Sequence, residues 1–400
     1  MQEPETNNGM RRPCFVCGSL EGPTHIDRTV DVLGVGKQRM AYRACGSCGL
    51  VLQDPAVPVE MMLRYYRNFS NYTNAGRGGE PTDRKKLIVE DQIKFVASHS
   101  LKPGSAFQVG CSDGYTLSRF AAAGWRVAGC DPSPATIALA EEKWNVKATV
   151  GDFESYEASV GEVYDLFILT HVLEHIYDPV AALQKAEGML ADNGALLVEV
   201  PLLTEVEHLI EGYFTFEHIN YFSHNSLVNT LEKAGFELVG SIHDDYEADQ
   251  YPIQRLVAKK KKDPKANLVR EEVWAANILA NFEDWELNQW QSRTAAAVAK
   301  VGKGKPAIIW AAGLHTSQLF FYTNIRNDLD IVAIVDNDSQ KWGSQLHDID
   351  VISPEDFWQN HADTPLVISS RASEKEIAAS LASKGKARDE IILLYQDIIH

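Results

Sequence analysis

Four cysteines near the start of the sequence are spaced as the ligands of a metal ion are. Cys14 and Cys17 form one Cys-x-x-Cys turn, and Cys45 and Cys48 form a second. Two such turns supply the four thiolates of a tetrahedral Zn²⁺ site. Because every ligand is a cysteine, no coordination position remains for water, and we expect a structural zinc ribbon. Unmetallated core cysteines are the alternative, but they have no reason to occur in pairs.

A glycine turn in the stretch AFQVGCSDGYTLSRFAAAGWRVAGCDPS is the second chemical feature. The pattern predicts a strand over 106–109, a turn over 110–114, a helix over 115–123 and a strand ending at Asp131. Such a unit places backbone N–H groups and a helix N-terminus at the carboxyl end of a strand, where a nucleotide-like ligand binds. Asp131 is suited to the two hydroxyls of a ribose.

The identity of the nucleoside depends on the residues between the glycines. A dinucleotide fingerprint requires Gly-x-Gly-x-x-Gly, but Ser112 and Tyr115 stand where the second and third glycines belong. Ser112 and Asp113 suit a ligand that carries an ammonium group better than a pyrophosphate. The turn therefore favours S-adenosylmethionine over NAD, and a turn without any ligand is the remaining alternative.

The chain then alternates strands with helices. We expect strands over 146–150, 164–170 and 195–200, the second mostly apolar, as in a parallel sheet buried on both faces. The sequence thus predicts an α/β doubly wound sheet with its functional loops at the strand carboxyl ends. The residues expected at the cofactor are Gly110, Cys111, Ser112, Asp113, Gly114, Asp131, Pro132, Asp152, Phe153 and His171.

The order GCSDG, CDPS, THVLEHIYDP and EVP resembles class I S-adenosylmethionine-dependent methyltransferases. Together with the cysteine turns and FEHINYFS at 216–223, it resembles the three-domain sugar C-methyltransferases that act on nucleotide-linked 4-keto deoxysugars. The resemblance implies a zinc-binding domain over 1–80, a methyltransferase domain over 81–262, and a linker helix with a Rossmann-like substrate domain over 263–400.

A carbon nucleophile is needed to take a methyl group from a sulfonium, and removal of a proton beside a ketone supplies one as an enolate. Histidine is a suitable base. The resemblance implies that His218 is this base, that Glu217 orients or binds, and that His175 lies near the keto group. Tyr72 and Tyr221 are expected to contact the substrate. A surface turn at 217–218 and a histidine that only satisfies a loop carbonyl at 175 are the alternatives.

Three departures from the sugar-enzyme pattern lie on the substrate side. They are Thr215, the stretch YPIQRL at 251–256 and the turn AAGLHTS at 311–317. An O- or N-methyl acceptor therefore remains an alternative to a keto sugar. In the last third, the charge run at 259–262 marks a linker, Trp274 begins a helix, and a second α/β unit follows from 307, where we expect no redox cofactor.

The composition sets outer limits. Four hundred residues predict two or three domains, and the net charge of −17 argues against general nucleic-acid binding. No apolar stretch is long enough to span a bilayer, and the first residues contain no apolar signal core, so we expect a cytoplasmic protein that binds a small molecule. A dinucleotide-dependent oxidoreductase and a non-catalytic zinc-ribbon adaptor are the competing classes, and the sequence does not indicate the number of subunits.

Overall fold

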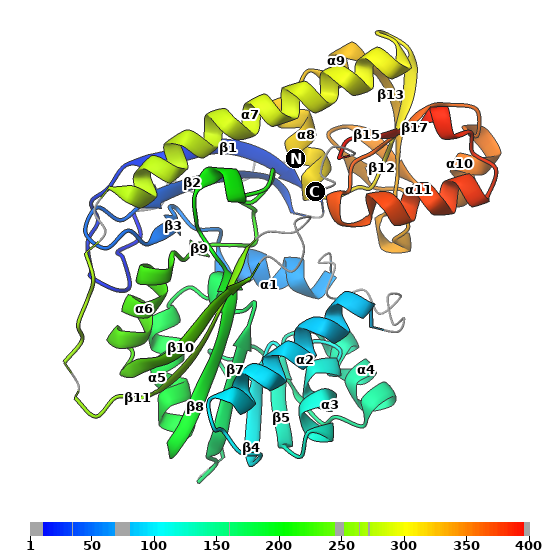
Figure 1. Cartoon of the computed structure of the whole chain (residues 1–400). Coiled ribbons are helices and arrows are strands. Elements are labelled where there is room, and N and C mark those ends of the chain that lie inside the picture. The colour runs from blue at the N-terminus through cyan, green and yellow to red at the C-terminus, as the bar shows by residue number, and fades with distance from the viewer. Residues whose placement is uncertain are drawn as a thin grey trace.

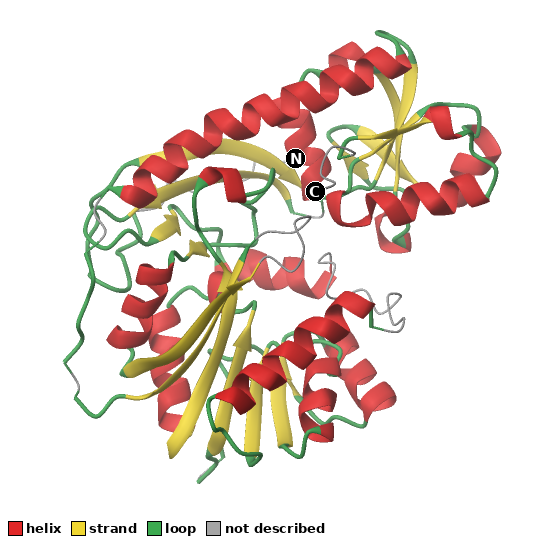
Figure 2. Cartoon of the chain, in the orientation of Figure 1, coloured by secondary structure: helices red, strands yellow, loops and turns green. Residues whose placement is uncertain are grey.

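The computed structural model describes residues 11–33, 35–68, 81–159, 161–244, 252–263, 265–270 and 273–395. These residues form three sheets. In Figure 1 the first sheet (blue) lies above the second (cyan to green), and the C-terminal sheet (yellow to red) lies to the right of the first. Helices cover the two larger sheets, whereas the sheet nearest the cysteine turns is covered mainly by one long helix (Figure 2). The α/β fold class expected from the sequence is confirmed.

The first sheet has four antiparallel strands in the order β1-β2-β3-β9. Their bounds are Thr24–Val32 for β1, Gly36–Ala44 for β2, Val51–Gln53 for β3 and Asn220–Tyr221 for β9. Val51 pairs with Tyr221 and Leu52 with Asn220. A strand from the middle of the chain therefore completes the sheet that follows the cysteine turns. Helix α1 (Val59–Asn68) leads from this sheet toward the second one.

The second sheet has seven strands in the order β10-β11-β8-β7-β4-β5-β6. The strands are β4 (Ser105–Val109), β5 (Arg126–Asp131), β6 (Thr149–Val150), β7 (Tyr164–Thr170), β8 (Leu190–Pro201), β10 (Phe236–Asp244) and β11 (Ile253–Lys260). The helices are α2 (Asp83–Ser98), α3 (Tyr115–Ala122), α4 (Pro134–Trp144), α5 (Pro179–Met189) and α6 (His224–Lys233), with short 3₁₀ turns η2 (Leu173–His175) and η3 (Val206–His208). Strands β4 to β8 run parallel, and β10 and β11 are antiparallel.

Successive strands are added on both sides of β4, with β5 and β6 on one side and β7 and β8 on the other. The loops after β4 and β7 therefore diverge and leave a crevice at their carboxyl ends, which is where open α/β sheets bind ligands. Residues 191–194 form a bulge within β8 between Leu190 and Ala195, which both pair with β7.

The third sheet has the order β14-β15-β13-β12-β16-β17 and follows the 28-residue helix α7 (Trp274–Val301). Its strands are β12 (Pro306–Trp310), β13 (Asp330–Val335), β14 (Gln345–Leu346), β15 (Ile349–Ile352), β16 (Leu366–Ile368) and β17 (Ile391–Leu393). Its helices are α8 (Leu314–Tyr322), α9 (Ile325–Asp328), α10 (Pro354–Asn360) and α11 (Glu374–Ser383), with 3₁₀ turns η4 (Ser339–Lys341), η5 (Arg371–Ser373) and η6 (Arg388–Glu390). Helix α7 lies along β1 and β2 before it reaches this sheet (Figure 1).

The connecting segment 202–219, between β8 and β9, is rich in aromatic side chains. Three of them, Tyr213, Phe214 and Phe216, are at most 3% exposed, as is Tyr221 of β9, and all four pack with β1, β2 and α7. These rings form the core between the first sheet and α7 rather than an open cover. Among the described residues, no helix is long and apolar enough to cross a membrane.

Candidate active site

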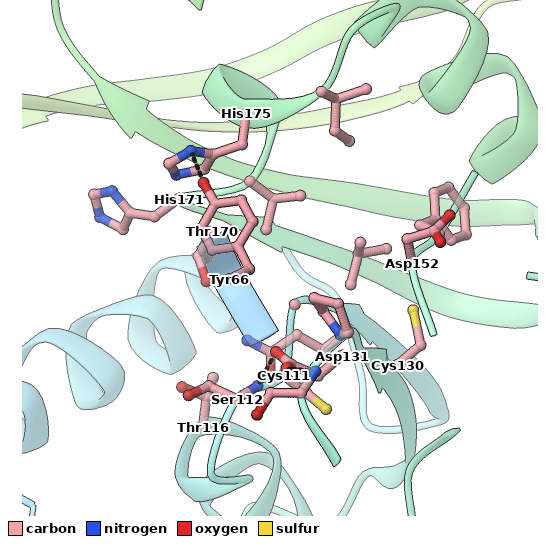
Figure 3. Close-up of a pocket in the computed structure, with 18 of the residues that line it drawn as sticks. Tyr66, Cys111, Ser112, Thr116, Cys130, Asp131, Asp152, Thr170, His171 and His175 are labelled. Atoms are coloured by element: carbon pink, nitrogen blue, oxygen red, sulfur yellow. Dashed lines mark hydrogen bonds between the residues drawn. The ribbon is translucent and has the colours of Figure 1, made fainter. Parts of the chain in front are cut away.

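A cavity of about 430 Å³ lies at the carboxyl ends of β4, β5, β7 and β8, where α1 and α2 close it from the other side. Figure 3 shows the side chains that line it. His171, His175 and Tyr66 lie at one end, and Cys111, Ser112 and Asp131 lie at the other. One cavity therefore connects the glycine turn with the histidines that follow β7.

The glycine turn after β4 requires its two glycines. Gly110 and Gly114 both have positive φ, at 65° and 76°. A Cβ on Gly110 would lie 2.9 Å from Cγ2 of Val172, and one on Gly114 would lie 2.6 Å from Cβ of Ala140. Glycine is the residue that adopts such a backbone without strain. Backbone atoms at Gly110 are consequently open to the cavity instead of being covered by a side chain.

Asp131 at the end of β5 fastens the turn to the next strand. Its Oδ2 accepts a hydrogen bond from Ser112 N at 2.8 Å, and its Oδ1 accepts one from Ser133 N at 2.9 Å. Burial raises the pKa of Asp131, and these hydrogen bonds oppose that effect. Each carboxylate oxygen has more than one lone pair, so the side chain can hold the turn and still accept a bond from a ligand hydroxyl.

Two further residues that are expected at the cofactor follow β6. Asp152 and Phe153 both line the cavity, and Figure 3 places Asp152 beside Cys130 at one wall. The Phe153 carbonyl accepts a hydrogen bond from Lys185 Nζ at 2.7 Å, and the ring is 3% exposed. The lysine thus fixes the loop that carries both residues. Pro132 and Cys111 also lie in the cavity wall.

Asp113 and Gly114 are not among the described residues that line the cavity. Asp113 instead forms an ion pair of 2.9 Å with Lys85 Nζ on α2. The lysine offsets the negative charge that the sequence assigned to an ammonium group of the ligand. Lys85 and its neighbour Arg84 do line the cavity, and sequence reasoning missed both, because nothing in the local pattern of α2 indicates that its first turn reaches the glycine turn.

The wall at the glycine turn fits S-adenosylmethionine. It offers uncovered backbone at Gly110, a carboxylate at Asp131 and an aromatic ring at Phe153, together with the cations of α2. Adenosine requires a ribose acceptor and an apolar surface, and the methionine carboxylate requires a cation. When bound there, S-adenosylmethionine supplies an activated methyl group.

His175 has a well-defined environment at the other end of the cavity. Its Nδ1 lies 2.7 Å from the Tyr66 hydroxyl and 2.9 Å from the Glu217 carbonyl oxygen (Figure 3 shows the contact with Tyr66). Since a carbonyl oxygen only accepts, Nδ1 carries the hydrogen. The other nitrogen, Nε2, lies 3.9 Å from Oε1 of Glu174.

His218 lies behind His175 with its ring centroid 4.9 Å away, and neither His218 nor Glu217 is among the described lining residues. Burial, followed by the neighbouring His175, lowers the pKa of His218 to about 3. Burial raises the pKa of Glu217, whose Oε1 accepts a hydrogen bond from the Tyr65 hydroxyl at 2.7 Å. His218 is thus neutral at ordinary pH, as a proton acceptor must be.

Two tyrosines, Tyr72 and Tyr221, are expected to contact the substrate. Tyr72 lies outside the described residues. Tyr221 is 1% exposed, and its hydroxyl accepts from Thr215 N at 2.7 Å and lies 3.2 Å from the Tyr213 carbonyl oxygen. Its ring contacts His218 at 5.7 Å between centroids. The structure therefore places Tyr221 behind the histidines. Tyr66, on α1, is the described tyrosine of that helix that lines the cavity.

The cysteine turns bring their four sulfurs together. Cys14 Sγ is 3.5 Å from Cys48 Sγ, Cys17 Sγ is 3.4 Å from Cys45 Sγ, and all four lie within 4.8 Å of one another. The two turns contain equivalent backbone hydrogen bonds: Gly18 N donates to the Cys14 carbonyl, and Gly49 N donates to the Cys45 carbonyl. These separations suit tetrahedral thiolates about one Zn²⁺ at roughly 2.3 Å, so the four cysteines could hold a metal ion.

Comparison with known proteins bears on the second sheet. A protein-family model described as a methyltransferase domain matches residues 83–241. The chain contains a methyltransferase domain. This region holds the glycine turn, Asp131 and all three histidines of the cavity region. A second family model, described as "C2185-like, N-terminal", matches residues 304–392 in the third sheet.

A curated relative is the C-methyltransferase NovU of Streptomyces niveus, which is 30% identical over 205 residues. The match covers 49% of this chain and 46% of NovU, so the chain spans about half the length of this relative.

Two solved structures are also similar to part of the chain. The 1,6-didemethyltoxoflavin-N1-methyltransferase of Burkholderia thailandensis, with bound S-adenosylhomocysteine, is 16% identical, with a TM-score of 0.42 over 53% of this chain and 96% of that one. The magnesium protoporphyrin IX methyltransferase of Synechocystis, also with bound S-adenosylhomocysteine, is 17% identical, with a TM-score of 0.42 over 51% of this chain and 100% of that one.

Proposed function

We propose that the protein is an S-adenosylmethionine-dependent methyltransferase that methylates carbon beside the keto group of a nucleotide-linked 4-keto deoxysugar. The observation that carries the proposal is the single cavity that joins the glycine turn to His175, with the neutral His218 ring directly behind it. The methyltransferase domain over 83–241 and the partial likeness to a C-methyltransferase support it.

In this proposal His218 removes the proton beside the ketone. Its low pKa keeps it unprotonated in the resting protein, and the buried carboxylate of Glu174 raises that pKa, so it favours the imidazolium once a proton arrives. His175, whose Nδ1 is fixed by the Glu217 carbonyl, presents Nε2 beside Glu174 and close to the keto oxygen. Alignment of the resulting carbon nucleophile with the methyl group supplies much of the rate.

Methylation of an oxygen or nitrogen on another small molecule or sugar nucleotide is the second candidate function. It is favoured by the chain's departures from the sugar-enzyme pattern at Thr215 and at 311–317, which lie toward the third sheet. A neutral histidine next to the cavity can deprotonate a hydroxyl as well as a carbon acid.

The test is incubation of the full chain with labelled S-adenosylmethionine and a panel of TDP-, GDP- and CDP-linked 4-keto sugars. We also expect exchange of the α-proton for deuterium in the absence of the methyl donor, because enolate formation does not require it. Methyl transfer without any such exchange would favour the oxygen or nitrogen acceptor.

His218→Ala should reduce α-proton exchange and methylation by about 100-fold or more, while S-adenosylmethionine affinity, measured by calorimetry, stays within a few fold. His208→Ala is the matched control, because His208 is an exposed histidine of the same connecting segment. Unchanged exchange in His218→Ala would remove this residue from the role of base.

A further inference from the structure

His171 occupies an unusual position directly after β7. Its backbone is left-handed, with φ at 56°, and its N–H donates to the Glu199 carbonyl at 2.8 Å. Residues with a side chain adopt this conformation only at a cost, and such strain is concentrated at functional sites. The conformation directs the imidazole into the cavity wall, where the side chain is 32% exposed.

The two ring nitrogens of His171 face carboxylates from two different elements. Nδ1 lies 3.4 Å from Oε1 of Glu174 in η2, and Nε2 lies 3.3 Å from Oε1 of Glu199 in β8. Both glutamates are at most 1% exposed. A neutral imidazole has a single N–H and no charge, whereas a protonated ring is attracted to both carboxylates. The contact of Nδ1 with Glu174 has the separation of an ion pair and not the geometry of a hydrogen bond.

We propose that His171 is a permanently protonated histidine, an imidazolium held between Glu174 and Glu199 in the wall of the cavity. In this arrangement neither nitrogen is available to accept a proton from a substrate. His171 is therefore a positioning residue, and its role differs from those of the other two histidines. Only its consequence for catalysis rests on the function proposed above.

The charges around His171 are balanced when the ring is protonated. Arg255 Nε on β11 lies 2.5 Å from Oε2 of Glu199, and Gln92 Nε2 on α2 donates to Oε1 of the same carboxylate at 3.1 Å. His171 and Arg255 thus offset Glu174 and Glu199. Burial raises the pKa of each glutamate, but the contact with His171 and the nearby cations outweigh it and leave both pKa values below the usual range.

Among the described residues, His175 in η2 and His218 in the connecting segment also interact with Glu174, and the Glu217 carboxylate interacts with His175. Burial, His175 and His171 all lower the pKa of His218, and Glu174 opposes them. The protonated His171 therefore helps to keep the neighbouring His218 neutral. The two imidazoles differ in protonation state, and hence in role, because their environments differ.

The test is ¹⁵N NMR of the full chain labelled at histidine ring nitrogens, with S-adenosylhomocysteine added and no acceptor. We expect one histidine to remain doubly protonated at about pH 8.5, well above the usual titration range, and to disappear from the spectrum in His171→Gln. A wild-type spectrum in which His171 is singly protonated at about pH 7.5 would overturn the proposal, even without any variant.

Glu174→Gln removes one of the two charges and keeps the shape of the side chain. We expect it to move the titration of His171 to lower pH by about one to three units. Glu187→Gln, on the surface of α5, is the control and should leave the titration unchanged. An unmoved titration in Glu174→Gln would also contradict the proposal. Because no acceptor is used, failure of the proposed methyl transfer would leave these results intact.

Discussion

At the scale of single residues, the site contains side chains of the same type that have different partners and therefore different roles. Asp131 and Asp113 are both acidic residues near the glycine turn, but Asp131 binds backbone N–H groups whereas Asp113 pairs with Lys85. His171 and His218 are similarly close to each other and differ in their partners. Residue type alone does not separate these roles, because the separation comes from burial and from the nearest opposite charge.

Asp131→Asn should weaken S-adenosylmethionine binding by about 10- to 100-fold, because hydrogen bonds to a charged acceptor contribute about 1.5–3 kcal/mol. The substitution places an amide N–H₂ opposite the N–H of Ser112 or Ser133, so one of these two hydrogen bonds is lost. Calorimetric titration measures the affinity. Asp192→Asn, at an exposed position in the β8 bulge, should bind normally.

His315 gives a pH dependence of stability. Burial lowers the pKa of His315 to about 4, and its Nε2 lies 2.8 Å from the Tyr395 hydroxyl. The unfolded chain takes up this proton near pH 6.5 and the folded chain only near pH 4, so stability is full above the first value and falls as pH drops between the two. The loss from this residue is about 3 kcal/mol at most.

Denaturant unfolding at about pH 7.5 and about pH 4.5 measures this effect. His315→Gln should be less stable than the wild type at the higher pH, and the difference should shrink at the lower one. His208→Gln, at an exposed histidine, should show no such convergence. A difference that stays constant with pH would contradict the assignment.

At the scale of elements, the short strand β9 connects the sheet that follows the cysteine turns to the proposed base. It pairs with β3, which follows the second cysteine turn, and it begins two residues after His218 in the chain. Tyr42 on β2 also donates a hydrogen bond of 2.7 Å to the Thr215 carbonyl. The cysteine turns are distant in sequence from His218, yet the sheet that they begin holds its backbone.

Cys45→Ser should therefore release the metal ion that we expect at the cysteines, lower the melting temperature and increase amide hydrogen exchange at Asn220 and Tyr221. S-adenosylmethionine affinity should change only a few fold, because the core of the second sheet around Phe95 and Trp125 contains no residue of the cysteine module. Metal analysis and hydrogen-exchange mass spectrometry measure these effects. Ser47→Ala, at an exposed position in the same turn, is the control, and normal protection of β9 in the metal-free variant would refute the coupling.

At the scale of the whole molecule, α7 joins the first sheet to the third through buried charges. Glu286 accepts from Arg28 NH1 on β1 at 2.9 Å and from Gly212 N at 2.6 Å. Further along α7, Arg293 binds Glu211 of the connecting segment, and Arg371 in η5 binds the same carboxylate. All three sheets thus contact the segment that carries His218, so its position depends on the entire chain.

Glu286→Gln should destabilise the protein by about 3–5 kcal/mol, because it leaves the buried guanidinium of Arg28 without its counter-charge. Asp27→Asn removes an exposed ion pair with Arg39 on the same sheet and should cost less than about 1 kcal/mol. Thermal unfolding compares the two variants. Equal effects would show that the buried pair does not join α7 to the first sheet.

Much of the fold could be read from local patterns. The glycine turn, the apolar strand at 164–170, the paired cysteines and the helix from Trp274 are each set by nearby residues, and the structure has strands β4 and β7 and helix α7 at these places. A strand buried on both faces requires a run of apolar residues, and a turn that excludes side chains requires glycine. Both patterns can be recognised in the sequence because each involves only a few neighbouring residues.

The tertiary structure alone decided which groups meet. The pairing of β9 with β3 and the ion pair of Asp113 with Lys85 join segments that are distant in the sequence. The burial of Tyr221 and the position of His171 between Glu174 and Glu199 likewise depend on the folded chain. Charge state follows from distance and burial, and these quantities arise only once the chain has folded. The sequence therefore determined the kinds of chemistry this chain contains, and folding determined which side chain performs each part.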